Sequence, residues 1–422
     1  MIVANHVRDD QLWSVVSYGS RNKGGLDKLC AFAFAVAPIL QHYIGVIQNA
    51  GFTVLLLIAP ILALKTFVRI SKGNSNSECL IAMIPMFLFG IYTVFVHGFD
   101  GSRLLLVLFL FLSYLGFSSG SVNVSFFLKY AVAIASFATF IVIIQYISHY
   151  LLNYNLDFRF LDYLAKEDTI WESNAAKMEE SSYSYFYRPA GIFLEPSHFF
   201  LYTFSLIAIM LLSPGINKPR RNVAIFLSLG IILTTSGMGI GCVVVLWTVY
   251  FILRNNNYDI KGILSRLFTV RTVLVGLAVV GVLIVAYMFV PIFHSSMARI
   301  FEASENQSAM DGRVRLARNF ARAISGKAVY IGTKGITNKL EFNLSGFYAT
   351  FFKWGVVGLI LTYWFYIQGI FKLYGVYFWI SLILVVISYY TAHTHGTFYM
   401  LYFMLFLMNG YYERSILKNR IT

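Results

Sequence analysis

The stretch FFLKYAVAIASFATFIVIIQYI at residues 126–147 decides the fold class of this chain. Lys129 is its one charged residue, and the stretch is long enough to cross a bilayer, for which a helix needs roughly 20 predominantly apolar residues. Its apolar residues are continuous instead of alternating, which argues against a strand of a membrane β-barrel. Because backbone groups in lipid must find hydrogen-bond partners within their own segment, we predict a transmembrane helix here.

The rest of the chain repeats this pattern. Apolar residues make up 58% of the sequence and charged residues 12%, whereas soluble domains carry roughly 25% charged residues. So little charge cannot cover the surface of a soluble globule of 422 residues, which excludes a soluble globular enzyme. We therefore predict an all-α, polytopic transmembrane helical bundle of about twelve spans. The predicted spans are 29–47, 52–70, 79–96, 104–117, 124–147, 196–212, 223–234, 238–253, 272–292, 344–367, 373–390 and 396–409.

The formal net charge of +14 does not indicate a nucleic-acid partner, because the basic residues lie mostly beside the predicted spans. Lys and Arg are enriched in the cytoplasmic loops of membrane proteins, and this rule sets the orientation. With the N-terminus inside, cytoplasmic loops receive groups such as Lys65, Arg69 and Lys72, whereas the short opposite loops contain Arg103 alone. Both termini are therefore expected in the cytoplasm, and no cleavable signal peptide is expected at residues 1–28.

Two long polar loops divide the spans into three groups, and both fall on the outer side. The first holds twice as many acidic as basic residues, and the second twice as many basic as acidic residues. Opposite charge favours loops that close over a shared cavity, and the alternative is that both are simply solvated. The expected segments are the N-terminal segment 1–28, spans one to five at 29–147, the first loop 148–195, spans six to nine at 196–292, the second loop 293–343, spans ten to twelve at 344–409 and the tail 410–422.

The sequence RPAGIFLEPSH at residues 188–198 ends the first loop. Proline suits the first turn of a helix, so a helix is expected to begin next to Glu195, where its dipole favours a carboxylate. Glu195 therefore either caps this helix or serves as a general base that takes a proton from a substrate hydroxyl. Gly191 lets the backbone approach a ligand closely, and Arg188 supplies a positive charge. His198 fits a structural histidine at the membrane surface better than a base, and we retain it as a substrate contact.

The sequence SAMDGRVRLARNFARAISG at residues 308–326 predicts an amphipathic helix in the second loop, capped by a glycine. Arginine binds phosphate in a bidentate geometry, so the arginine row indicates either a phosphate site or a helix that rests on anionic headgroups. Arg313 falls near the apolar face beside Asp311, which favours a position inside a site. One face gathers Met310, Val314, Ala317, Ala321 and Ile324, and another Arg315, Arg318 and Arg322.

These segments resemble the bacterial O-antigen polymerases of the Wzy type, which share a membrane superfamily with the O-antigen ligases. The similarity lies in the hydropathy of the whole chain and in four short motifs. The ligases carry a histidine at the last junction, where this chain has Asn343, which argues against a ligase. The motifs are Arg188-x-x-Gly191 with Glu195-Pro196, the turn TTSG at residues 234–237, Arg315 and Gly326 with ten residues between them, and NLSGFYATFFKWGVVG at residues 343–358.

The resemblance implies a membrane glycosyltransferase, a polysaccharide polymerase at the outer, periplasmic face of the bacterial inner membrane. Its substrates would be oligosaccharides linked to undecaprenyl diphosphate, with membrane lipid around it and a chain-length regulator protein as a partner. We expect Arg188, Arg313 and Arg315 to bind the diphosphate. Glu195 is the expected base, with Asp311 as the substitute. No nucleotide or metal is expected, because the lipid diphosphate is already a good leaving group and the sequence has no Walker motif or Asp-x-Asp pair.

The alternative class is a transporter, in particular a flippase for the same lipid-linked sugar. A flippase predicts charged residues inside the spans, facing a central cavity. Here the predicted spans hold few charges, mainly Lys129 and Lys353, and charge concentrates in the two outer loops. The sequence therefore favours the polymerase, with the flippase and the ligase as alternatives.

Overall fold

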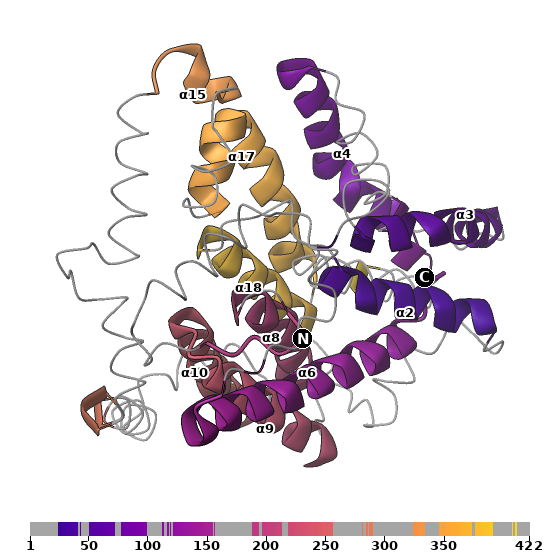
Figure 1. Cartoon of the computed structure of the whole chain (residues 1–422). Coiled ribbons are helices and arrows are strands. Elements are labelled where there is room, and N and C mark those ends of the chain that lie inside the picture. The colour runs from indigo at the N-terminus through magenta and orange to yellow at the C-terminus, as the bar shows by residue number, and fades with distance from the viewer. Residues whose placement is uncertain are drawn as a thin grey trace. The chain divides into compact units, whose positions relative to one another are not determined.

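The computed structural model describes residues 24–40, 43, 50–71, 77–98, 112–113, 116–117, 119, 121–154, 156, 188–193, 196–212, 218–255, 281, 284–285, 287–289, 324–333, 346–373, 376–390, 407 and 410–411 (Figure 1). The extended regular elements of these ranges are all helices, which confirms the all-α fold class. Within them, four helices are long and apolar enough to cross a membrane if length and composition alone are considered. They are α3 (Ala50–Ser71), α6 (Val124–Leu152), α10 (Gly237–Asn255) and α17 (Gly346–Lys372).

The count of about twelve spans is not supported. Four further helices, each covering much of a predicted span, have only 15 to 17 residues, fewer than the roughly 20 that a perpendicular crossing requires. The predicted spans 104–117, 272–292 and 396–409 lie largely outside the described residues. The four shorter helices are α2 (Gly25–Leu40), α8 (Pro196–Leu212), α9 (Lys218–Leu233) and α18 (Val376–Tyr390).

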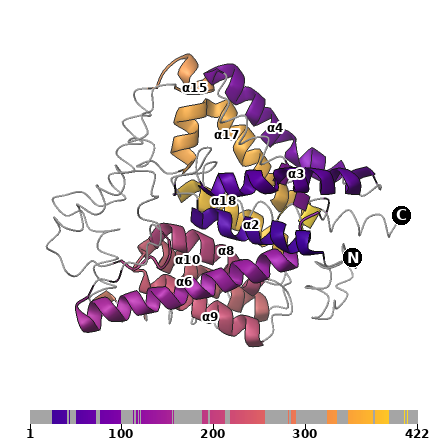
Figure 2. The same ribbon diagram turned by 45° about the vertical axis from the view of Figure 1, so that its right-hand side comes forward.

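The chain divides into two compact units. Unit 1 comprises Met1–Ile134 and Gly312–Thr422, and unit 2 comprises Ala135–Asp311, so the boundary falls within α6. Figure 2 shows the helices of both units from a second direction. Unit 1 contains α2, α3, α4 (Ser77–His97), the short α15 (Lys327–Ile331), α17 and α18; unit 2 contains most of α6 with α8, α9 and α10.

Large apolar side chains cover the outside of unit 1. Leu57 and Phe67 of α3 are 72% and 71% exposed, and Phe95 of α4 is 83% exposed. Soluble monomers rarely expose contiguous apolar patches of this kind, whereas lipid tails solvate them at no cost. The exposed surface therefore agrees with the length and composition of the helices, and both fit a protein that lies in a membrane.

A charge pair between the buried Asp27 and the half-buried Lys65 joins α2 to α3 in unit 1. The Lys65 ammonium donates to the carboxylate of Asp27 and also to the backbone carbonyl of Ser121, at 2.8 Å. Asp27 lies in the first turn of α2, where the helix dipole favours a carboxylate. Three separate segments are thus held together by one ammonium group.

The helix α17 is broken at Gly355, which corrects the prediction of one continuous span at 344–367. Gly355 has a φ of 66° and a ψ of −168°, outside the helical region. The rings of Phe347 and Tyr363 lie 5.8 Å apart, although their Cα atoms would be about 24 Å apart in a straight helix. The two halves therefore fold back on each other, and Figure 2 shows them as the two legs of a bend.

Candidate functional site

The end of α6 in unit 2 is the first part of the candidate site. Ser148 accepts a hydrogen bond from the Tyr154 amide at 3.0 Å, and its hydroxyl donates to the Tyr154 carbonyl at 2.7 Å. Between them Asn153 adopts a φ of 51°, a left-handed conformation that asparagine tolerates better than most residues. The chain therefore leaves α6 through a closed turn into the first large loop.

Gln145 joins the two ends of that loop. Its side-chain oxygen accepts a hydrogen bond from the Gly191 amide at 2.8 Å, and its nitrogen donates to the carbonyl of Gly191 at 3.4 Å and of Leu156 at 3.3 Å. The side chain is buried, so these hydrogen bonds satisfy polar groups that have little access to solvent. Gln145 was not predicted as a functional residue from the sequence. The feature that could have indicated it is a polar amide side chain in the last turns of an otherwise apolar run.

Gly191 lies in close contact with another part of the backbone, and that part is α6. Its φ is +66°, and a Cβ atom at this position would lie 2.8 Å from the Ala138 carbonyl oxygen and 3.2 Å from a methyl carbon of Val142. A residue other than glycine would be strained in its backbone and would collide with the helix. The sequence predicted a close approach at Gly191, to a ligand; the approach that the structure describes is to the backbone of α6.

Aromatic packing fixes the other side of the same segment. The Phe193 amide closes a turn onto the Ala190 carbonyl at 3.1 Å. The Phe193 ring is buried and lies 5.8 Å from the ring of Phe199 and 5.2 Å from that of Tyr202, both on α8. α8 begins at Pro196, the residue that the sequence predicted to open this helix.

Arg188 and His198 flank this anchored segment. Both side chains are half-buried, and the Nε atom of Arg188 and the Nδ1 atom of His198 are buried. Arg188 directly precedes the segment held by Gln145, and His198 lies in the first turn of α8. The remaining predicted residues, Glu195, Asp311, Arg313 and Arg315, lie outside the described residues.

In unit 1, the end of the predicted arginine-rich helix contacts α17. Ile324, the last residue of its predicted apolar face, packs against Ala349 and Phe352, together with Tyr348 and Phe351. Two residues later Gly326 has a φ of 60° and a ψ of −135°, which is not the left-handed helical conformation of a C-terminal cap, and it directly precedes α15. The second loop therefore returns to the membrane helices at the first half of α17.

The segment after Ile324 crosses the break in α17. The Thr333 amide and hydroxyl donate to the Phe352 carbonyl at 2.8 and 3.1 Å, and the Tyr92 hydroxyl of α4 donates to the Trp354 carbonyl at 2.8 Å. A break in a helix frees such carbonyls, which must find other partners inside a membrane protein. Gly332 and Gly355 let the two backbones meet, since a Cβ on Gly332 would fall on the Lys353 carbonyl and one on Gly355 on the Tyr330 carbonyl.

Neither part of the candidate site includes a metal-binding arrangement. In the ranges that the structure describes, no group of three or more His, Cys, Asp or Glu side chains lies close enough to hold a metal ion. Comparison of the chain with protein-family models finds no match, and comparison with curated proteins finds none. The function is therefore argued from the residues alone.

Replacing Gly191 with alanine is expected to destabilise the protein by roughly 2–4 kcal/mol, because alanine at this φ is strained and its methyl group meets the Ala138 carbonyl. Gly241 of α10 is the matched control. It has open space around it, and alanine is the better helix former, so Gly241→Ala should leave stability unchanged or raise it. Thermal unfolding of the purified variants in detergent measures both. Equal melting temperatures for the two variants would show that the 188–193 segment does not pack on α6.

Proposed function

We propose that this protein is a polysaccharide polymerase of the bacterial inner membrane, with about twelve spans and both termini in the cytoplasm. It would transfer a growing glycan from undecaprenyl diphosphate onto a lipid-linked repeat unit at the outer face. The observation that carries the proposal is the anchoring of residues 188–193. Through Gln145, this segment is held to the end of α6, with Arg188 half-buried at one end and the start of α8 at the other.

Glycosyl transfer from a lipid diphosphate needs two things from a protein. A base must take the proton of the acceptor hydroxyl, and cations must neutralise the diphosphate as it departs. The acceptor oxygen attacks the anomeric carbon, the bond from that carbon to the diphosphate oxygen breaks, and the diphosphate leaves with the electron pair. In this proposal the proton passes to Glu195, which directly precedes α8, and Asp311 is the substitute base.

Arginine is the side chain suited to the departing diphosphate, because its planar guanidinium contacts two phosphate oxygens at once. Arg188 would contribute from the first loop, with Arg313 and Arg315 from the second. Burial of the Arg188 Nε atom supports this role, because a positive charge partly withdrawn from water interacts more strongly with an anion. Gly191 and His198 would shape the site, and a chain-length regulator is the proposed partner protein.

The test is the surface-polysaccharide ladder of a strain that lacks this protein. A strain without a polymerase still exports and attaches one repeat unit, so we expect the ladder to collapse to a single rung. The same single rung is expected from strains that carry Glu195→Gln, which retains the shape of the side chain but cannot take the proton, and from strains that carry Arg188→Ala. Wild-type protein supplied in trans should restore the ladder, and immunoblotting should show equal amounts of each variant.

Each other outcome identifies a different function. Loss of all surface sugar would indicate a flippase, and polymer that stays on the lipid carrier would indicate a ligase. A normal ladder with Glu195→Gln, together with a single rung in the deletion strain, would retain the polymerase and move the base to Asp311. A normal ladder with both Glu195→Asp and Glu195→Gln would mean that Glu195 only caps the helix.

A further inference from the structure

Four aromatic residues meet in unit 1 on the inner side of the bend in α17. We call Phe347, Tyr348, Tyr363 and Tyr389 the aromatic cluster. Phe347 is its centre: its ring lies 5.4 Å from that of Tyr348, 5.8 Å from that of Tyr363 and 5.3 Å from that of Tyr389. The cluster combines both halves of α17 with the end of α18, and it exists because the helix is broken at Gly355.

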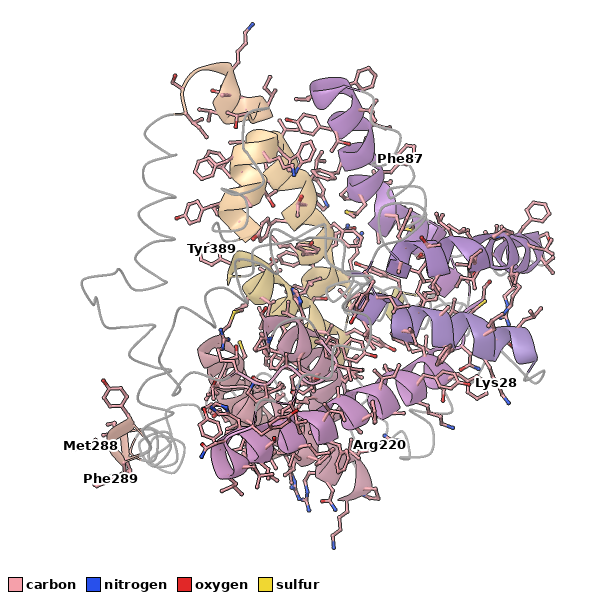
Figure 3. The ribbon with its side chains drawn as sticks, viewed as in Figure 1. Lys28, Phe87, Arg220, Met288, Phe289 and Tyr389 are labelled. Carbon is pink, nitrogen blue, oxygen red and sulfur yellow. The ribbon has the colours of Figure 1, made fainter. Side chains whose placement is uncertain are left out.

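The cluster presents polar groups as well as ring faces. The Tyr389 and Tyr348 hydroxyls interact, whereas the Tyr363 hydroxyl is buried and the Ser388 hydroxyl donates to the Val385 carbonyl at 2.8 Å. Tyr389 is 40% exposed and Tyr348 and Tyr363 are half-buried, so the cluster is accessible from one side. Figure 3 shows Tyr389 where α18 approaches the first half of α17. Isolated tyrosines at a membrane surface are common, but these rings contact one another and form one continuous surface.

This combination suits a sugar ring. One face of a pyranose carries C–H groups with a slight positive charge, and these pack on the electron-rich face of an aromatic ring. The hydroxyls at the edge of the sugar need hydrogen-bond partners, which the hydroxyls of Tyr348 and Tyr389 offer. Tyrosine also loses little conformational freedom on binding, so such a surface is prepared for its ligand before the ligand arrives.

Part of the aromatic cluster lies on the same half of α17 that a residue of the second loop contacts. Ile324, within that loop, packs against Ala349 and Phe352 on the first half of α17, and Tyr348 packs against the same two residues. In the sequence, Arg315 precedes Ile324 by nine residues. A glycan joined to a diphosphate at the arginines would therefore have the aromatic cluster near it along the chain.

We propose that the aromatic cluster is a stacking site for a sugar ring of the lipid-linked glycan. The inference rests on the proposed function for the identity of the glycan, and on the geometry of α17 and α18 for the site. Tyr389, the most exposed member, provides the outer face, and Phe347 holds Tyr348, Tyr363 and Tyr389 in place.

The test uses the full chain in nanodiscs of bacterial lipid. The probe is one repeat unit of the strain's own surface polysaccharide, prepared by partial acid hydrolysis, and binding is measured by calorimetry. Tyr389→Leu retains apolar contact with Phe347 but removes the ring face, and should weaken binding roughly three- to tenfold. Tyr389→Phe retains the ring face and should stay closer to wild type. Phe371→Leu is the matched control, since Phe371 is 79% exposed near the opposite end of α17.

Tyr389→Leu with wild-type affinity and a wild-type melting temperature would overturn the stacking site. Absence of binding to the wild-type protein would also overturn it, and the polymerase would still stand if the deletion strain showed a single rung. Conversely, tyrosine-dependent binding with an unchanged ladder in the deletion strain would remove the polymerase and retain the sugar site. An equal loss of affinity in Phe371→Leu would show that the effect comes from the apolar surface in contact with lipid. The proposal that the aromatic cluster binds a sugar ring would then be wrong.

Discussion

Alanine at Gly355 or at Gly332 is expected to prevent unit 1 from folding normally. Both glycines have positive φ values, 66° and 79°, at which alanine loses about 1–2 kcal/mol. In addition, the new methyl group would fall on a backbone carbonyl of the facing segment, which no side-chain rotation can relieve. The backbones must then separate, breaking the hydrogen bonds of Thr333 to Phe352, so the total loss should be at least about 4 kcal/mol.

Gly326 separates the two causes of this loss. It lies in the same segment with a φ of +60°, but nothing is within 4 Å of its Cβ position. Gly326→Ala should therefore show the backbone strain alone, as a modest fall in melting temperature. Gly355→Ala and Gly332→Ala should give little monodisperse protein on size-exclusion chromatography in detergent. Similar melting temperatures for all three variants would mean that α17 is not in backbone contact with the segment before it.

The sequence predicted the helices better than their interruptions. α8 spans the predicted residues 196–212, because a proline opens it and an apolar run without glycine or proline follows. Within the predicted span 344–367, the sequence analysis did not predict the break at Gly355. Its break depends on Tyr92 and Thr333, which supply partners for the freed carbonyls and are remote in sequence. No local pattern contains that information.

Some residues of the candidate site could be predicted from the sequence, and others could not. Arg188 and Gly191 stood out because a charge and a glycine precede a helix start, and both lie within the anchored segment 188–193. Gln145 did not stand out, since its partner Gly191 is 46 residues away and the periodicity of the span conceals a single amide. Pairing across such a distance is a property of the folded chain, so only the three-dimensional arrangement shows why Gly191 must be glycine.

Removing one member of the Asp27–Lys65 pair is expected to be the other severe change, with a loss on the order of 3 kcal/mol. Asp27→Asn leaves the half-buried Lys65 ammonium with the Ser121 carbonyl as its remaining described partner, and Lys65→Met leaves the buried Asp27 carboxylate without its counter-charge. A charge that is largely withdrawn from water and has lost its partner costs more than the pair itself contributes.

The double variant Asp27→Asn/Lys65→Met tests this reasoning, because it removes both charges at once. Its melting temperature in detergent should recover most of the loss seen in the worse single variant, which is the non-additivity expected of two groups in contact. Lys28→Met is the control: Lys28 is the exposed neighbour of Asp27, so its loss should change stability little. Single and double losses that simply add would show that the two side chains do not interact. α2 and α3 would then be held together by apolar packing alone, and the ammonium of Lys65 would have no part in joining them to residue 121.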